Sequence, residues 1–166
     1  GLVLLMGFGY KKLSSLALTG VFVIYSVLMG LSIGMILLMY TASTVYMTFG
    51  ITAATFLAMA LLGYTTKSDL TKFGSLLFMA LFGIIIAMIV NWFLQSGVLD
   101  YIISIVGVLV FTGLTAYDVQ KIKKLSYQVQ DGAEDTKKMV VMGALNLYLD
   151  FVNLFLFLLR IFGGRD

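Results

Sequence analysis

Polar side chains at helical spacing mark the stretch of the chain with the clearest chemical potential, close to its C-terminal end. Asn146, Asp150, Asn153 and Arg160 are spaced by four, three and seven residues, which places them on one face of an α-helix. Phe157 fills the remaining step of that face. A carboxylate at the centre of a bilayer costs about 2.5–3.5 kcal/mol on insertion scales. We therefore expect this helix to be central, with its polar face against other helices or a water-filled path.

A second acidic residue, Asp118, lies near the end of another apolar run. Thr115 precedes it by three residues and shares its helix face, so it is expected to support the same polar surface. Lys121 follows three residues later, and a solvated charge at the boundary of the span is an alternative interpretation of Asp118.

If Asp118 and Asp150 face one cavity, they form a pair with proton and cation chemistry. Neighbouring carboxylates in a low dielectric resist double ionisation, so such a pair shares a proton and responds to pH without a histidine. When deprotonated, its oxygens are hard ligands suited to weak binding or passage of Ca²⁺. The alternative for Asp150 is a structural carboxylate, paired with Arg160 or Lys12.

Composition limits the function further. Hydrophobic residues make up 61% of the chain and charged residues 11%, whereas a soluble domain carries about a quarter charged residues. The basic residues are dispersed at the ends of apolar runs. The sequence lacks the basic stripe with interleaved aromatic residues that is typical of nucleic-acid binding. The sequence has no His and no Cys. Of the enzyme classes, an intramembrane aspartyl protease needs only an Asp pair, but its surrounding motifs are absent, so we expect neither an enzyme nor a cofactor.

The apolar segments predict an all-α integral membrane protein, with residues 1–166 forming a single transmembrane helical domain. The stub Gly1–Tyr10 is expected to be the end of a helix that begins upstream, so that an N-terminal portion is lacking. Turns are expected at Thr41–Thr44 and Gln95–Gly97, and a long polar loop at Lys121–Lys138. Five spans of sufficient length are predicted near Leu16–Met39, Val45–Tyr64, Phe73–Leu94, Val98–Tyr117 and Met139–Phe162.

Lysines indicate the orientation. The connections around Lys11 and Lys12, from Lys67 to Lys72, and from Lys121 to Lys138 are basic and alternate along the chain, so all three should be cytoplasmic. Arg160 leaves two alternatives for the side of the membrane on which the C-terminus lies. A full last span puts the C-terminus outside, and a short or re-entrant segment keeps it inside.

Small residues predict where helices approach closely. They recur every four residues in the first two spans, a spacing that lets helix backbones come together in lipid. The alternative is that glycine is simply common in membrane helices. The residues concerned are Ser26, Gly30 and Gly34 in the first span and Gly50, Ala54, Ala58 and Leu62 in the second.

Several of these segments resemble a known family. LNLYLDFVNLFLFLLRIFG (Leu145–Gly163) and FTGLTAYDVQKIK (Phe111–Lys123) look like the C-terminal signature of the Bax inhibitor-1 family. MIVNWFLQ (Met88–Gln95) and GYTTKSDLTKFGSLLFMAL (Gly63–Leu81) are similar to its bacterial members.

The resemblance implies about seven spans in the full protein, five plus a stub here, with a central C-terminal helix wrapped by the others. It implies a pH-sensitive, calcium-permeable leak in a bacterial inner membrane, with Asp118 and Asp150 as the pH-sensing pair. A basic residue latches this pair in the family, and Lys12 or Lys11 stands at the corresponding place. Some bacterial relatives instead modulate a membrane-bound ATP-dependent protease, so a membrane interaction protein is the alternative.

Overall fold

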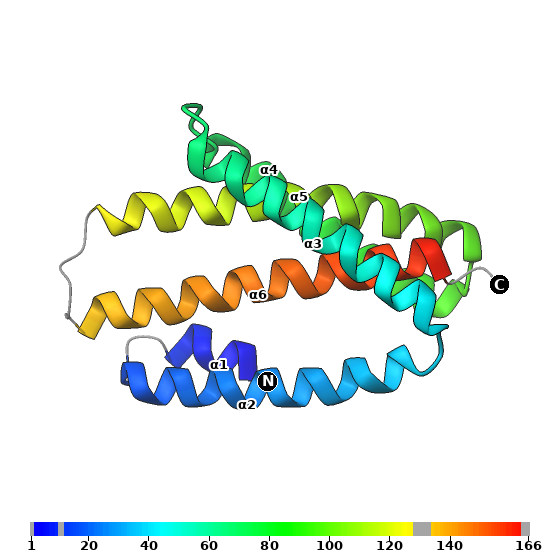
Figure 1. The fold of residues 1–166 in the computed structure, drawn as a ribbon, viewed down its shortest axis with the longest axis horizontal. Coiled ribbons are helices and arrows are strands. Elements are labelled where there is room, and N and C mark those ends of the chain that lie inside the picture. Colours follow the sequence, from blue (N-terminus) through cyan, green and yellow to red (C-terminus); the bar gives the residue numbers. More distant parts are fainter. Residues whose placement is uncertain (1, 10–11, 128–133, 164–166) are drawn as a thin grey trace.

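The computed structural model describes residues 2–9, 12–127 and 134–163. Within these residues the chain consists of helices joined by short turns, with no strand, which confirms the predicted all-α class (Figure 1). The helices in chain order are α1 (Leu2–Gly9), α2 (Ser15–Leu37), α3 (Ala42–Thr65), α4 (Thr71–Leu94), α5 (Gly97–Ser126) and α6 (Glu134–Gly163).

Helices α2 to α6 are each long and apolar enough to cross a membrane, which confirms the five predicted spans. α2, the shortest of them, has 23 residues, or about 35 Å at 1.5 Å per residue, against a hydrocarbon core of about 30 Å. The chain is therefore a multi-pass membrane protein.

The predicted polar loop at Lys121–Lys138 is wrong over most of its length. α5 continues to Ser126 and α6 begins at Glu134. Lysine and leucine are good helix formers, and lysines in the last turn of α5 complement the negative end of its dipole. Both α5 and α6 therefore extend beyond their apolar segments into the polar part of the sequence.

Side-chain caps explain where the spans begin. The hydroxyl of Ser14 accepts a hydrogen bond from the backbone N–H of Ala17, and Ser96 does the same for Leu99, at 3.1 and 3.2 Å. Thr41 caps α3, so the predicted turn at Thr41–Thr44 exists but ends three residues earlier than expected. Each cap satisfies an N–H that the first helical turn leaves unpaired.

α6 is the central helix, as predicted. Figure 1 shows it running between α2 and α5, with α3 crossing over it. Leu145, Leu154 and Leu159 of α6 are at most 1% exposed. Phe151 of α6 makes edge-to-face ring contacts with Phe49 and with a second phenylalanine of α3, at 5.8 and 5.4 Å between centroids. Contacts with three other spans thus surround α6.

The prediction of close helix contacts at the small residues of the first two spans is wrong for their glycines. Gly30, Gly34 and Gly50 are exposed, and a methyl group added to any of them would meet nothing within 4 Å. α2 packs on α1 and α6, whereas α3 packs on α5 and α6, so the two small-residue faces do not meet. Glycines do enable close packing elsewhere: Gly63 lies against Ala116, Gly74 against Tyr117, and Gly107 against Phe157.

The end of the last span is settled by its neighbours. Gly163 packs against Tyr40 and Thr44, beside the start of α3. Arg160 forms an ion pair with Asp100, in the first turn of α5, at 3.6 Å. α6 is continuous from Glu134 to Gly163 and is neither short nor re-entrant. The end of the bundle where α3 and α5 finish and α4 begins is called the lysine-rich end. The C-terminal end of α6 lies at the opposite end of the bundle.

A candidate proton and cation site between α5 and α6

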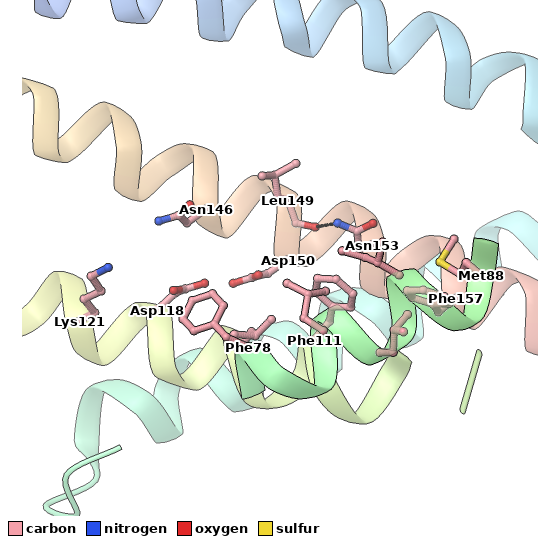
Figure 2. A pocket seen from close by; sticks show the side chains of 14 residues that line it. Phe78, Met88, Phe111, Asp118, Lys121, Asn146, Leu149, Asp150, Asn153 and Phe157 are labelled. Carbon is pink, nitrogen blue, oxygen red and sulfur yellow. Dashed lines mark hydrogen bonds between the residues drawn. The ribbon is translucent and has the colours of Figure 1, made fainter. Parts of the chain in front are cut away.

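The register of two antiparallel helices brings Asp118 and Asp150 together. The rings of Phe111 on α5 and Phe157 on α6 stack with their centroids 5.8 Å apart. Asp118 follows Phe111 by seven residues, and Asp150 precedes Phe157 by the same number. Seven residues are about two helical turns, so both carboxylates emerge on the facing sides of their helices at the same level. Figure 2 shows the two carboxyl groups pointing toward one another.

Both aspartates are buried in the bundle. Asp118 is 7% exposed and Asp150 is 4% exposed. The Oδ2 atom of Asp150 has no hydrogen-bond partner among the described residues. A buried carboxylate without a partner is costly, and two facing carboxylates repel each other. A proton held between the two groups, or a cation beside them, removes both penalties.

A cavity of about 380 Å³ opens beside the pair. One wall carries both carboxylates together with Asn146 and Asn153 from α6. The opposite wall comes from α4 and is apolar, formed by Phe78, Leu81, Ile84, Ile85 and Met88.

A second cavity of about 320 Å³ adjoins the first on the side of the lysine-rich end. Its lining comes from α1, α5 and α6 and includes Ile122, Leu125 and Met139. Asp118, Lys121 and Asn146 line both cavities. The two cavities therefore meet at Asp118, and Asp150 lies just beyond this junction, in the lining of the first cavity.

The amides of the predicted polar face lie in this region. Asn146 lines both cavities, and Asn153 lines the first (Figure 2). The side-chain N–H of Asn153 donates to the backbone oxygen of Leu149 at 2.8 Å, which leaves its carbonyl oxygen for the cavity. Amide oxygens at this position extend the polar wall that the two carboxylates begin.

Two other predicted residues of this face do not reach the cavities. Thr115 is fully buried, and its hydroxyl donates to the backbone oxygen of Phe111 in its own helix. Arg160 pairs with Asp100 and lies over the ring of Phe157. It is ten residues from Asp150, or about 15 Å along the helix. The helix face was identified correctly, but its length separates Arg160 from the carboxylate pair.

The basic residue beside the carboxylate pair in this structure is not the one predicted as its latch. Lys12 is exposed in the turn after α1, and among the described residues no ion pair joins it to Asp118. Lys11 lies outside the described residues. Lys121, which the sequence analysis named only as the basic residue that follows Asp118, lines both cavities. Its spacing of three residues from Asp118 was the available signal, because such residues are neighbours on a helix surface.

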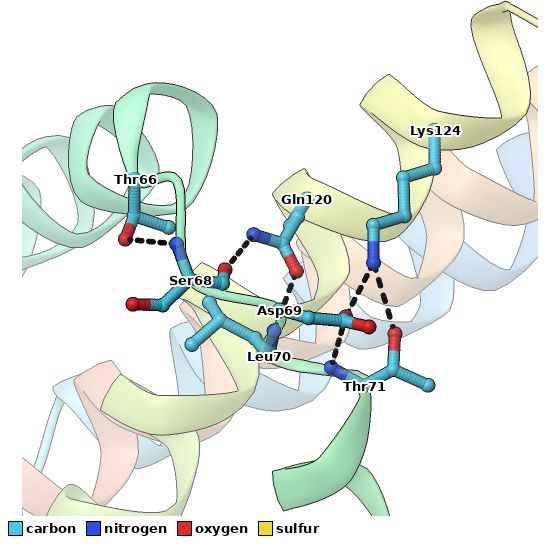
Figure 3. Close-up of polar contacts among 7 residues, drawn as sticks. All are labelled: Thr66, Ser68, Asp69, Leu70, Thr71, Gln120 and Lys124. Carbon is cyan, nitrogen blue, oxygen red and sulfur yellow. Dashed lines mark hydrogen bonds and ion pairs between the residues drawn. The ribbon is translucent and has the colours of Figure 1, made fainter.

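A polar clamp holds the turn of α5 that carries Asp118 (Figure 3). Gln120 is 6% exposed. Its side-chain oxygen accepts a hydrogen bond from the backbone N–H of Leu70, and its side-chain nitrogen donates to the backbone oxygen of Ser68, each at 2.8 Å. Lys124 forms an ion pair with Asp69 at 2.5 Å. The hydrogen bond from Lys124 holds the pKa of Asp69 well below its usual range. The connection between α3 and α4 is thereby fastened to α5 next to the carboxylate pair.

Comparison with known proteins gives a consistent result. The family model described as "Inhibitor of apoptosis-promoting Bax1" matches residues 1–166. A protein of Borreliella burgdorferi is 52% identical over 165 residues, covering 99% of this chain and 71% of that protein. The inner membrane protein YbhL of Escherichia coli K12 is 48% identical, with coverage of 99% and 70%. A membrane protein of Streptococcus pyogenes is 42% identical over 158 residues, with coverage of 95% and 68%.

Proposed function

The chain belongs to the Bax inhibitor family of membrane proteins, and we propose that it is a pH-sensitive, calcium-permeable leak whose ion path passes Asp118 and Asp150. Its relatives include proteins named as inner membrane or membrane proteins, in agreement with the predicted location in a bacterial inner membrane. The observation that carries the proposal is the pair of facing, buried carboxylates at the junction of two cavities.

The cavities suggest the course of the path. The second cavity leads from the lysine-rich end to Asp118, and the first continues past Asp150 and Asn153. The stacked rings of Phe111 and Phe157 lie beyond, on the side toward the Arg160 end. Because two buried rings offer an ion no polar ligand, this stack is the barrier that closes the path in the present conformation.

The charge of the pair provides the pH response. When both carboxyl groups are ionised, they attract a divalent cation and repel each other, which loosens the packing of α5 against α6. Protonation removes both the attraction and the repulsion. Flux and helix packing should therefore change together between acid and neutral pH.

The number of ligands favours passage over storage. Ca²⁺ takes six to eight oxygen ligands in proteins. The site offers two carboxylates and the oxygens of Asn146 and Asn153, and no cluster of three or more acidic side chains is present in the described part of the chain. We expect weak calcium binding, no resident cofactor and no enzymatic step.

Calcium flux into proteoliposomes tests the proposal. Vesicles loaded with a calcium-sensitive dye and containing the protein should take up Ca²⁺ faster than protein-free vesicles, at a rate that depends on pH. Glu134→Gln is the matched control, because it removes one exposed carboxylate from the lysine-rich end without touching either cavity. Flux equal to that of protein-free vesicles at every pH would contradict the proposal. An interaction protein that modulates a membrane-bound ATP-dependent protease would then be the leading function.

A further inference from the structure

The first cavity combines features that calcium passage does not use. Its α4 wall, which includes the ring of Phe78, is apolar, and the rings of Phe111 and Phe157 line the cavity as well. At about 380 Å³ it falls within the range of about 300–1,000 Å³ that is typical of small-molecule sites. A hydrated Ca²⁺ ion gains nothing from such a wall, whereas an apolar group of a ligand is stabilised by it.

The charged groups of the same cavity complement a single positive charge. They are the carboxylates of Asp118 and Asp150 and the ammonium group of Lys121. When the three are ionised, two negative charges and one positive charge leave a net charge of −1. Asp150, whose side chain is 4% exposed, lines the cavity, and its Oδ2 atom has no hydrogen-bond partner among the described residues.

From this combination we propose that the cavity binds an amphiphilic monocation, namely a protonated amine with a compact apolar body. The ammonium group of the amine donates to Asp150 and is shared with Asp118, whose carboxyl group points toward that of Asp150 (Figure 2). The apolar body lies along the α4 wall toward Met88, against the aromatic rings. Aromatic faces near the ammonium group add cation–π attraction. A bound amine occupies the proposed ion path and competes with Ca²⁺ at the carboxylate pair.

The test uses 4-phenylbutylamine and its neutral counterpart 4-phenylbutanol, with the protein in lipid nanodiscs. Binding is measured by calorimetry against empty nanodiscs, which corrects for partition into lipid. The amine should bind the protein at least about tenfold more tightly than the alcohol, because a charge-assisted hydrogen bond is worth about 1.5–3 kcal/mol and 1.4 kcal/mol is a factor of ten. Equal affinity for the two probes overturns the proposal, because filling of the apolar cavity would then explain the binding of both without any role for the charge.

Variants locate the site. Asp150→Asn should weaken amine binding roughly tenfold or more, and Glu134→Gln, which changes an exposed carboxylate outside both cavities, should leave it unchanged. Met88→Trp fills the apolar end without changing a charge, and should weaken both probes. Met88→Trp keeps the test decisive if Asp150→Asn does not fold. Unchanged amine affinity in a folded Asp150→Asn or Met88→Trp variant overturns the proposal.

Calorimetry and flux fail separately. If the amine binds through Asp150 while no variant conducts Ca²⁺, the binding site stands and the leak does not. If Ca²⁺ flux depends on Asp150 but the amine does not bind, the leak stands and the amine site is refuted. If both hold, 4-phenylbutylamine should slow Ca²⁺ flux and 4-phenylbutanol should not.

Discussion

Gly63 of α3 packs directly on the backbone of Ala116 in α5. A methyl group added to Gly63 would lie 2.3 Å from the carbonyl oxygen of Ala116, and 2.9 Å from its carbonyl carbon. Ala116 lies two residues before Asp118, so this contact sets the position of the turn that carries one member of the carboxylate pair.

Gly63→Ala should therefore destabilise the protein. Backbone atoms cannot rotate out of the way as a side chain does, so overpacking here should cost about 1–3 kcal/mol or more. Gly50→Ala is the matched control, in the same helix but with nothing within 4 Å of the new methyl group. Because alanine favours helix by up to about 1 kcal/mol over glycine, the control should be neutral or slightly stabilising. Thermal unfolding in detergent measures both, and equal midpoints for the two variants would contradict the close contact.

The aromatic stack should limit ion flux. Phe157→Leu removes the ring that stacks on Phe111 and lies against Gly107. We expect faster Ca²⁺ flux at every pH with the pH dependence retained, because the barrier is weakened and both carboxylates remain. Phe82→Leu, on an α4 residue that is 66% exposed, should leave the flux unchanged. A Phe157→Leu rate no higher than that of the unmodified protein would show that the barrier lies elsewhere.

The ion pair between Asp69 and Lys124 should stabilise the protein in a defined pH range. Because the pKa of Asp69 is lowered in the folded state, the contribution is present above the unfolded pKa of about 3.9 and is lost as the pH falls below it. Asp69→Asn should lower the unfolding temperature between pH 5 and pH 8, and the difference should shrink below about pH 4. Lys124→Met removes the same pair and should give the same profile. A difference that stays constant down to pH 3 would contradict the assignment.

Helices with strong apolar content were predictable from the sequence, and so was the central place of the last one. The polar spacing of Asn146, Asp150 and Asn153 in an apolar segment admits few other positions, because a lipid-facing carboxylate is expensive. The error at Lys121–Lys138 arose because polarity was taken as a sign of a loop, whereas α5 and α6 extend beyond their apolar segments.

Contacts between helices were predictable only in part. Gly30 and Gly34 have the spacing of a packing motif, but spacing does not say which face of α2 meets a neighbour. The same limit affected Arg160, which shares a face with Asp150 but lies at the end of the helix. The cavities and the role of Lys121 in their lining depend on the register of α5 against α6. That register follows from the fit of side chains such as Phe111 and Phe157, which no periodicity records.

The central claim, that Asp118 and Asp150 act as one proton-sensing unit in a calcium path, is tested most directly by the pH profile of Ca²⁺ flux. Asp118→Asn, Asp150→Asn and the double variant keep side-chain size but cannot ionise, so they separate charge from shape. We predict that each single variant loses most of the ratio between the fluxes at acid and neutral pH, and that the double variant adds little, as coupled residues do. Single variants that both retain the unmodified pH profile would contradict the account.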